Sequence, residues 1–196
     1  MKEIELPITQ TVSATIQFTK EGIIDKDIGF IINTEIQESM RVARNNGGKI
    51  LYATTSIEQE LESFLMTYFM GPFNEPDARR HLFENELLKS TIMSFSSKKS
   101  LFIKILNSKR FIKGSEKEQL TKQLNTIMNW RNAFAHGKVQ HDTEKGCSLK
   151  YYSGNQKEQI LDDKYWDTVL SVFESCKKLL TKSRDNMQRK LYPDSF

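Results

Sequence analysis

The sequence is poor in the features that mark disulfide frameworks, metal centres and membrane spans. It has two cysteines, Cys147 and Cys176, without the paired spacing of a metal site, so free thiols in a reducing compartment are expected. No window approaches the roughly 18 consecutive apolar residues of a transmembrane helix. The N-terminal stretch MKEIELPITQ lacks the charged and apolar regions of a signal peptide. We therefore expect a cytoplasmic protein that does not enter a membrane.

Common catalytic signatures are also missing. The three histidines, His81, His136 and His141, show no metal-ligand spacing with one another or with the cysteines. No glycine-rich phosphate loop is present, and the serines near residue 97 do not form a nucleophile elbow. We expect neither a metal nor a cofactor.

Positive charge is concentrated in one part of the chain. The 196 residues are 38% hydrophobic and 28% charged, which is a globular balance sufficient for one substantial core, and the net charge is +4. Residues 97–122 contain eight basic and two acidic residues, so this segment alone carries +6. It is either a solvated helix and loop or a surface that binds RNA.

Hydrophobic periodicity predicts a mainly α-helical protein. Apolar residues recur at helical spacing in five long segments and a shorter one, and these helices are expected over residues 25–44, 51–70, 78–95, 117–135 and 162–191, with a short helix and turn in 99–112. We expect Asn45–Gly48 to end the first helix. The runs KVQHD and SLKYY bracket TEKG and predict a small β-hairpin. Residues 1–20 read as a strand-like arm, which leaves 21–196 as a single domain.

The stretch NWRNAFAHG, residues 129–137, is the most informative. At 100° per residue, Arg131 falls at about 20° from Leu120, near the centre of the apolar stripe of its helix. A buried arginine must be paired, reach a polar cleft or lie in a subunit interface, because an unpaired buried charge is costly. Glu60 or Glu62 is the expected partner. His136 would lie in the last turn, where a histidine is often only structural, with Gly137 as a left-handed cap.

The RNAFAHG sequence resembles the R-x4-6-H motif of the HEPN superfamily. A polar residue usually follows the arginine in that motif, and Asn132 occupies this place. The two long helices before the motif, the short β segment after it and the closing amphipathic helix are also similar, over about residues 25–190. The arrangement further resembles the mannitol-repressor-like branch of the superfamily. The resemblance implies an antiparallel helical bundle.

The resemblance also implies an activity. Many HEPN proteins are metal-independent endoribonucleases, often toxins of toxin–antitoxin pairs or phage-defence effectors, and their motif lines a cleft between two identical chains. By this resemblance Arg131 would bind the scissile phosphate, His136 would transfer protons and Asn132 would orient the phosphate. RNA, a second copy of the chain and an antitoxin are then the expected partners. Side chains expected to contact RNA are Lys98, Lys99, Lys104, Lys109, Arg110 and Tyr151.

A second hypothesis stays open at this point. Some HEPN proteins have lost activity, so the chain could be a non-catalytic module that binds RNA, a nucleotide or a protein. Arg131 would then anchor the fold through Glu60 or Glu62. A mannitol-repressor-like regulator belongs to this alternative, although no helix-turn-helix pattern is evident.

Overall fold

The computed structural model describes residues 18–19, 22–23, 34–72, 78–142 and 144–193. The chain divides into two compact units, Met1–Thr34 and Glu35–Phe196. In the first unit, β1 (Phe18–Thr19) pairs antiparallel with β2 (Gly22–Ile23). The other residues of the predicted N-terminal arm, 1–17 and 20, lie outside the described residues, as does the predicted boundary between residues 20 and 21.

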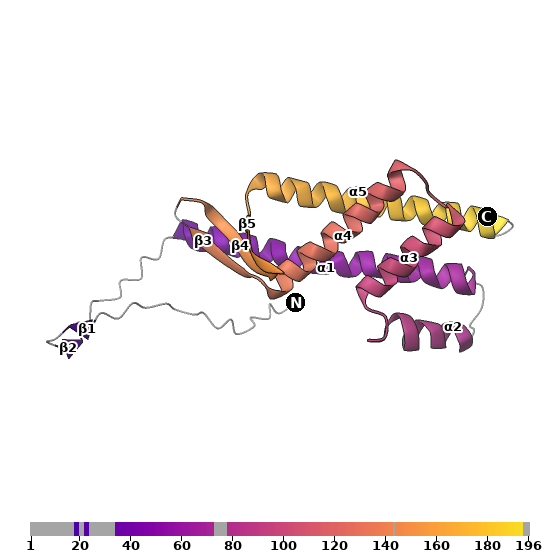
Figure 1. Cartoon of the computed structure of the whole chain (residues 1–196), viewed down its shortest axis with the longest axis horizontal. Coiled ribbons are helices and arrows are strands. Elements are labelled where there is room, and N and C mark those ends of the chain that lie inside the picture. Colours follow the sequence, from indigo (N-terminus) through magenta and orange to yellow (C-terminus); the bar gives the residue numbers. More distant parts are fainter. Residues whose placement is uncertain (1–17, 20–21, 24–33, 73–77, 143, 194–196) are drawn as a thin grey trace. The chain divides into compact units, whose positions relative to one another are not determined.

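Helices make up most of the second unit, which confirms the predicted mainly α class (Figure 1). The helices are α1 (Thr34–Met70), α2 (Ala78–Leu82), the π-helical segment η1 (Phe83–Leu88), α3 (Phe95–Lys109), α4 (Ser115–His136) and α5 (Asp163–Leu191). An antiparallel sheet follows α4 and has the order β3 (Lys138–Asp142), β4 (Gly146–Ser153), β5 (Asn155–Ile160). The predicted hairpin is β3–β4, and β5 was not predicted. Among the described helices, none combines the length and apolar composition needed to cross a membrane.

α1 is continuous over 37 residues, so the predicted helix end at Asn45–Gly48 is wrong. A Cβ atom on Gly47 would lie 2.6 Å from the Cδ1 atom of Phe134 on α4. The glycine at this position therefore permits close approach of the two helices. Close packing offsets the cost of glycine in a helix, which is about 1 kcal/mol relative to alanine.

The predicted single helix over residues 78–95 is also wrong. Its helical part ends with η1 at Leu88, and a new helix begins at Phe95. The Ser94 hydroxyl accepts a hydrogen bond from the backbone N–H of Ser97 at 3.2 Å, so Ser94 caps the start of α3. Arg110 adopts a left-handed conformation, with φ of 54°, and ends this helix.

The four longer helices lie alongside one another, with the sheet near the start of α1 and the end of α4 (Figure 1). α1 and α5 run in the same direction, because Glu60 pairs with Arg184 and the carbonyl of Thr67 pairs with Tyr192 further along both helices. α4 runs the opposite way and contacts α3, α5 and β4. The carboxylate of Asp162 caps α5 by accepting from the Tyr165 N–H at 2.8 Å.

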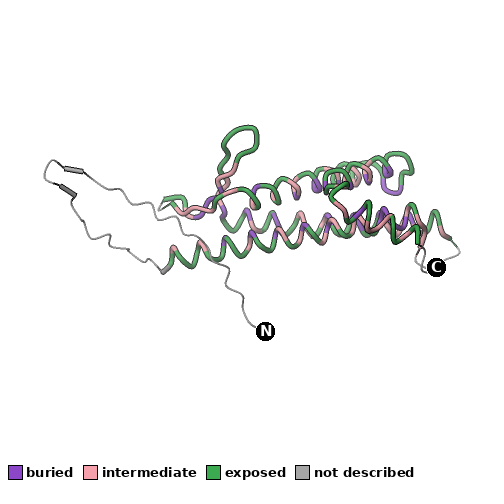
Figure 2. Tube along the Cα trace, turned by 90° about the horizontal axis from the view of Figure 1, so that it is seen from below, coloured by how far each residue is buried: buried purple, intermediate pink, exposed green. Residues whose placement is uncertain are grey.

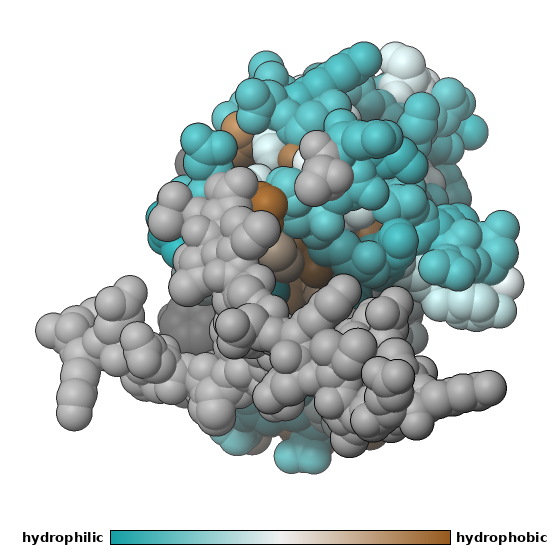
Figure 3. All heavy atoms as spheres, turned by 90° about the vertical axis from the view of Figure 1, so that its left-hand side faces the viewer, coloured by the Kyte–Doolittle hydropathy of each residue, from teal (hydrophilic) through white to brown (hydrophobic). Residues whose placement is uncertain are grey.

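The hydrophobic core consists of two clusters. The larger contains the second half of α1, α3, the first part of α4 and most of α5, and the smaller contains the first half of α1, the end of α4, the sheet and the start of α5. Trp130 and Phe173 pack against both clusters, with ring centroids 6.2 Å apart. Figure 2 shows buried positions recurring along the inward sides of these helices, with exposed positions between them. In Figure 3, hydrophilic residues cover most of the visible described surface, and hydrophobic surface appears between them.

Candidate functional site

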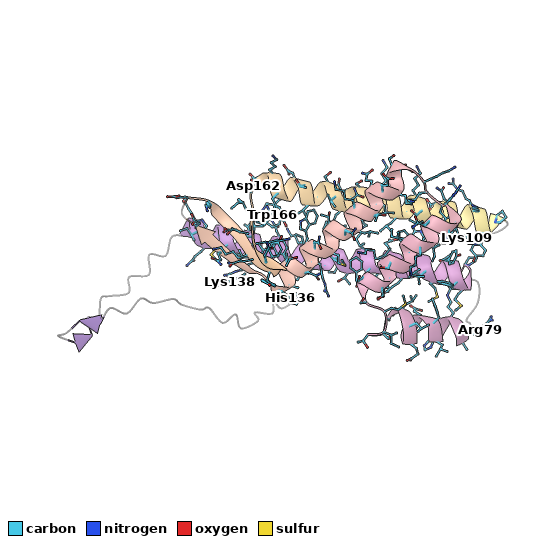
Figure 4. The ribbon with its side chains drawn as sticks, viewed as in Figure 1. Arg79, Lys109, His136, Lys138, Asp162 and Trp166 are labelled. Carbon is cyan, nitrogen blue, oxygen red and sulfur yellow. The ribbon has the colours of Figure 1, made fainter. Side chains whose placement is uncertain are left out.

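The stretch with the HEPN-like motif forms the last turns of α4 and the turn into β3 (Figure 4). The N–H of Gly137 donates to the carbonyl of Ala133 at 2.7 Å. Gly137 has φ of −91° and ψ of 171°, so the predicted left-handed cap is wrong. The glycine is needed for space, because a Cβ atom here would lie 2.9 Å from the Cδ1 atom of Leu149 and 3.0 Å from the Lys150 carbonyl oxygen.

Arg131 is exposed, contrary to the prediction that it lies in the core stripe. The first part of α4 buries Leu120, Leu124 and Ile127, whereas the buried residue near its end is Ala133. At 100° per residue, Ala133 lies about 140° from Leu120. The buried face thus rotates along α4, because its first part packs in the larger cluster and its end packs in the smaller cluster with the sheet. Arg131 therefore lies on a side of α4 that is no longer buried at this end of the helix.

The predicted pairing of Arg131 with Glu60 or Glu62 is wrong. Glu60 accepts from Arg184 at 2.9 Å, and Glu62 accepts from Lys98 at 2.5 Å. The Nη1 of Arg131 instead donates to the Oδ1 of Asn132 at 3.1 Å. Among the described residues, no carboxylate forms an ion pair with Arg131. Its guanidinium is therefore available to an anionic ligand.

Arg131 lines a cavity of about 280 Å³ between α1, the start of α3 and the end of α4. The other lining residues are Leu51, Thr54, Thr55, Glu58, Phe95 and Ala135. None of these residues was predicted to belong to the site. Glu58 lies one turn before Glu62 on α1, and this helical spacing was the available signal that both carboxylates serve one partner.

That partner is Lys98, whose side chain is only 5% exposed. Its Nζ lies 2.6 Å from an oxygen of Glu58 and 2.5 Å from one of Glu62. Burial lowers the pKa of Lys98, but the hydrogen bonds and charges of the two carboxylates outweigh it and leave this pKa above its ordinary value. Glu58 is the member of this triad that lines the cavity. Lys98 is buried and paired within the protein, so it is a structural residue and not part of an exposed RNA surface.

Asn132 and His136 are both exposed and lie four residues apart on α4, so they are neighbours on the helix surface. His136 is the last residue of the helix and lies close to Lys138 at the start of β3 (Figure 4). Asn132 also accepts a hydrogen bond from Arg131, which lines the cavity. The polar side chains of the motif therefore continue to the edge of the cavity. The motif thus exposes an amide and an imidazole on one face near the end of α4 and a cation on a different face.

The remaining residues of the predicted RNA surface lie in several environments. Lys104, Lys109 and Arg110 are exposed on α3 and at its end, and Lys99 is half-buried. Tyr151 is half-buried on β4 and packs against the smaller hydrophobic cluster. None of these residues lines the cavity at Arg131.

The described residues contain no group of three or more histidine, cysteine, aspartate or glutamate side chains arranged to hold a metal ion. Both cysteines are buried and free, and burial raises the pKa of the Cys176 thiol to about 12. Comparisons with protein-family models, with curated proteins and with solved structures found no match for this chain.

Proposed function

We propose that this chain is a metal-independent endoribonuclease of the HEPN type, acting as a toxin or as a phage-defence effector. The observation that carries the proposal is the exposed arginine at the cavity, which has no carboxylate partner among the described residues. An arginine that anchors a core must be paired, because an unpaired buried charge is costly. Arg131 is exposed and therefore has no such role. The resemblance of RNAFAHG to the R-x4-6-H motif supplies the reaction class.

In the proposed reaction the ribose 2′-oxygen attacks the adjacent phosphorus. The bond from phosphorus to the 5′-oxygen breaks, and the products are a 2′,3′-cyclic phosphate and a 5′-hydroxyl end. Arg131 would bind the non-bridging oxygens and stabilise the charge that develops on them. His136 would accept the 2′-hydroxyl proton or donate a proton to the leaving 5′-oxygen, and Asn132 would hold the phosphate beside the arginine.

A second copy of the chain would complete the proposed site. Arg131 and His136 are five residues apart, about 140° round the helix, so one chain presents them in different directions. A twofold interface through the end of α4 would place the arginine of one chain near the histidine of the other. The exposure of all three motif residues is compatible with such an interface.

The test is an RNA cleavage assay in excess EDTA with the wild type, Arg131→Ala and His136→Ala. Loss of the proton-transfer group should slow cleavage by about 10²- to 10⁴-fold. His81→Ala is the matched control, because His81 is also exposed and lies outside the motif on α2. Cleavage that leaves 2′,3′-cyclic phosphate ends and is lost only in the motif variants would support the proposal. Undiminished cleavage in both motif variants would refute it.

A non-catalytic RNA-binding module is the second candidate. Lys104, Lys109 and Arg110 are exposed in the segment of concentrated positive charge, and this surface exists whether or not RNA is cleaved. Binding of RNA by the wild type without any cleavage product would favour this candidate.

A further inference from the structure

A second cavity, of about 500 Å³, lies between α3 and α4. We call it the α3–α4 groove, and its lining residues are Ile103, Asn107, Lys117, Glu118, Thr121, Lys122, Asn125 and Thr126. It shares no lining residue with the cavity at Arg131. The motif and the proposed cleavage reaction do not use it.

Two lysine–asparagine hydrogen bonds join α3 to α4 at the groove. Lys117 and Asn107 both line it, whereas Lys99 reaches it through the lining residue Asn125. The Nζ of Lys99 on α3 donates to the Oδ1 of Asn125 on α4 at 2.6 Å. The Nζ of Lys117 on α4 donates to the Oδ1 of Asn107 on α3 at 2.9 Å. On each helix the lysine and the asparagine are eight residues apart, so the two hydrogen bonds are separated by about 12 Å along the helices.

Both pairs leave hydrogen-bond donors unused. An ammonium group has three donors and a side-chain amide has two, and each pair uses one donor of its lysine. Among the described residues, no carboxylate forms an ion pair with Lys99, Lys117 or Lys122. Glu118 is the only carboxylate that lines the groove, and it is exposed. The groove therefore presents an excess of donors and positive charge.

Among the lysines at the groove, Lys99 has a charge that no carboxylate of the described residues compensates. It is half-buried, and besides Asn125 its Nζ has only the sulfur of Met128 within reach, at 3.9 Å. Burial without a compensating negative charge lowers the pKa of Lys99. An anion in the groove would compensate this charge, as the carboxylates do for the neighbouring Lys98.

We propose that the α3–α4 groove binds the phosphodiester backbone of single-stranded RNA. Two donor-rich pairs about 12 Å apart suit an extended chain of phosphates better than one small anion, which cannot contact both. The lysines and amides contact phosphates through charge and hydrogen bonds, so binding is independent of base sequence. The choice of RNA over another polyanion rests on the proposed function.

The experiment measures binding of a labelled 2′-O-methyl RNA oligonucleotide by fluorescence anisotropy over a range of salt concentrations. This probe lacks the free 2′-hydroxyl that the proposed cleavage needs, so binding is measured without cleavage. For single strands, each phosphate neutralised contributes about 0.7 to the slope of log affinity against log salt concentration. We expect Lys99→Gln and Lys117→Gln each to reduce that slope by about 0.7 and to weaken binding at low salt.

Lys157→Gln is the matched control, because Lys157 is exposed on β5 and lies outside the groove. Thermal unfolding of each variant would establish that it folds. A wild-type slope in both groove variants would overturn the inference, as would equal reductions in the control. Displacement of the oligonucleotide by inorganic phosphate at equal phosphate concentration would overturn it in favour of a small-anion site.

Cleavage of unmodified RNA in the same preparation separates this inference from the proposed function. Groove-dependent binding without cleavage would leave the inference standing and refute the ribonuclease. Cleavage with groove variants that bind like the wild type would support the ribonuclease and refute the inference.

Discussion

Lys98 and Lys99 are adjacent in sequence and lie on two sides of α3 with opposite electrostatics. Lys98 faces α1 and is held by Glu58 and Glu62. Lys99 faces α4 and contacts only an amide oxygen and a thioether. Of these two adjacent lysines, Lys98 therefore belongs to a structural ion triad, and Lys99 is a cation available to a ligand. Positive charge in a sequence indicates a binding surface only where the fold supplies no internal carboxylate.

The two cavities differ in the same way. The cavity at Arg131 includes Glu58, which shares the positive charge of Lys98 with Glu62. The α3–α4 groove has Glu118 at an exposed position and no internal neutralisation of Lys117. The first thus presents one arginine beside an internally paired ion triad, whereas the second presents an extended excess of donors. This difference suits a localised reaction at one cavity and sequence-independent backbone contacts at the other.

The largest expected effect is a difference in the free energy of unfolding between variants of Lys98 and Lys99. Lys98→Met should reduce the free energy of unfolding by about 3 kcal/mol, because it leaves two partly buried carboxylates without their cation. Lys99→Met should change it by about 1 kcal/mol or less, since only hydrogen bonds to neutral groups are lost. Urea unfolding followed by circular dichroism measures both. Equal losses would remove the distinction between the two sides of α3.

Residues of α1 and α4 line the cavity at Arg131, so its shape depends on the spacing between the two helices. Substitutions at the neighbouring glycines Gly47 and Gly48 test this spacing. Gly47→Ala should lower the free energy of unfolding by about 1–2 kcal/mol, because the new methyl group would overlap the ring of Phe134. Gly48→Ala is the control. A Cβ atom there meets nothing within 4 Å, so this change should stabilise the helix by up to about 1 kcal/mol. Similar thermal unfolding midpoints for the two variants would contradict the assigned packing.

Alkaline pH should act on the two lysines in opposite directions. The pKa of Lys98 is raised on folding, so its contribution is complete below its ordinary value of 10.5 and is lost as the pH rises through the folded-state pKa. The pKa of Lys99 is lowered by burial, so its cost to folding is relieved as the pH rises toward 10.5. The measurement is the difference in unfolding free energy between the wild type and each Lys→Met variant, from neutral pH upward. Parallel pH profiles for the two differences would be inconsistent with this account.

The smallest expected effect concerns Arg131. Because it is exposed and donates only to Asn132, Arg131→Ala should change the free energy of unfolding by less than about 0.5 kcal/mol. Arg184→Ala loses the partly exposed pair with Glu60 and should cost about 0.5–1 kcal/mol. Denaturant midpoints of the two variants are the readout. A larger loss at Arg131 would assign it to the fold and not to a ligand.

Much of the fold could be predicted from the periodicity of the sequence. The apolar stripe of α5 and its cap at Asp162 depend on local spacing, and the runs of β3 and β4 have turn residues between them. The continuity of α1 could not be predicted, because the role of Gly47 depends on Phe134, which is 87 positions later in the sequence. The strand β5 is mostly exposed and has no apolar alternation that would reveal it.

The motif at the end of α4 could be located from the sequence, but its environment could not. A single helical wheel assumes that one face is buried along the whole helix, whereas α4 leaves one hydrophobic cluster and enters another. Glu60 and Glu62 were predicted as partners of Arg131, yet Glu60 pairs with Arg184 and Glu62 pairs with Lys98. Several cations of the chain could pair with these carboxylates, and the spacing within one helix does not show which pairs form.

Both tryptophans of the chain, Trp130 and Trp166, pack against the smaller hydrophobic cluster. Trp130 stacks on Phe173, and Trp166 lies 6.1 Å from Phe134, measured between ring centroids. Neither contributes to the α3–α4 groove. Intrinsic tryptophan emission consequently reports on the smaller cluster and, through Trp130, on its junction with the larger one, while circular dichroism reports on all helices. Coincidence of the two signals during denaturation would show that the clusters melt as one cooperative body.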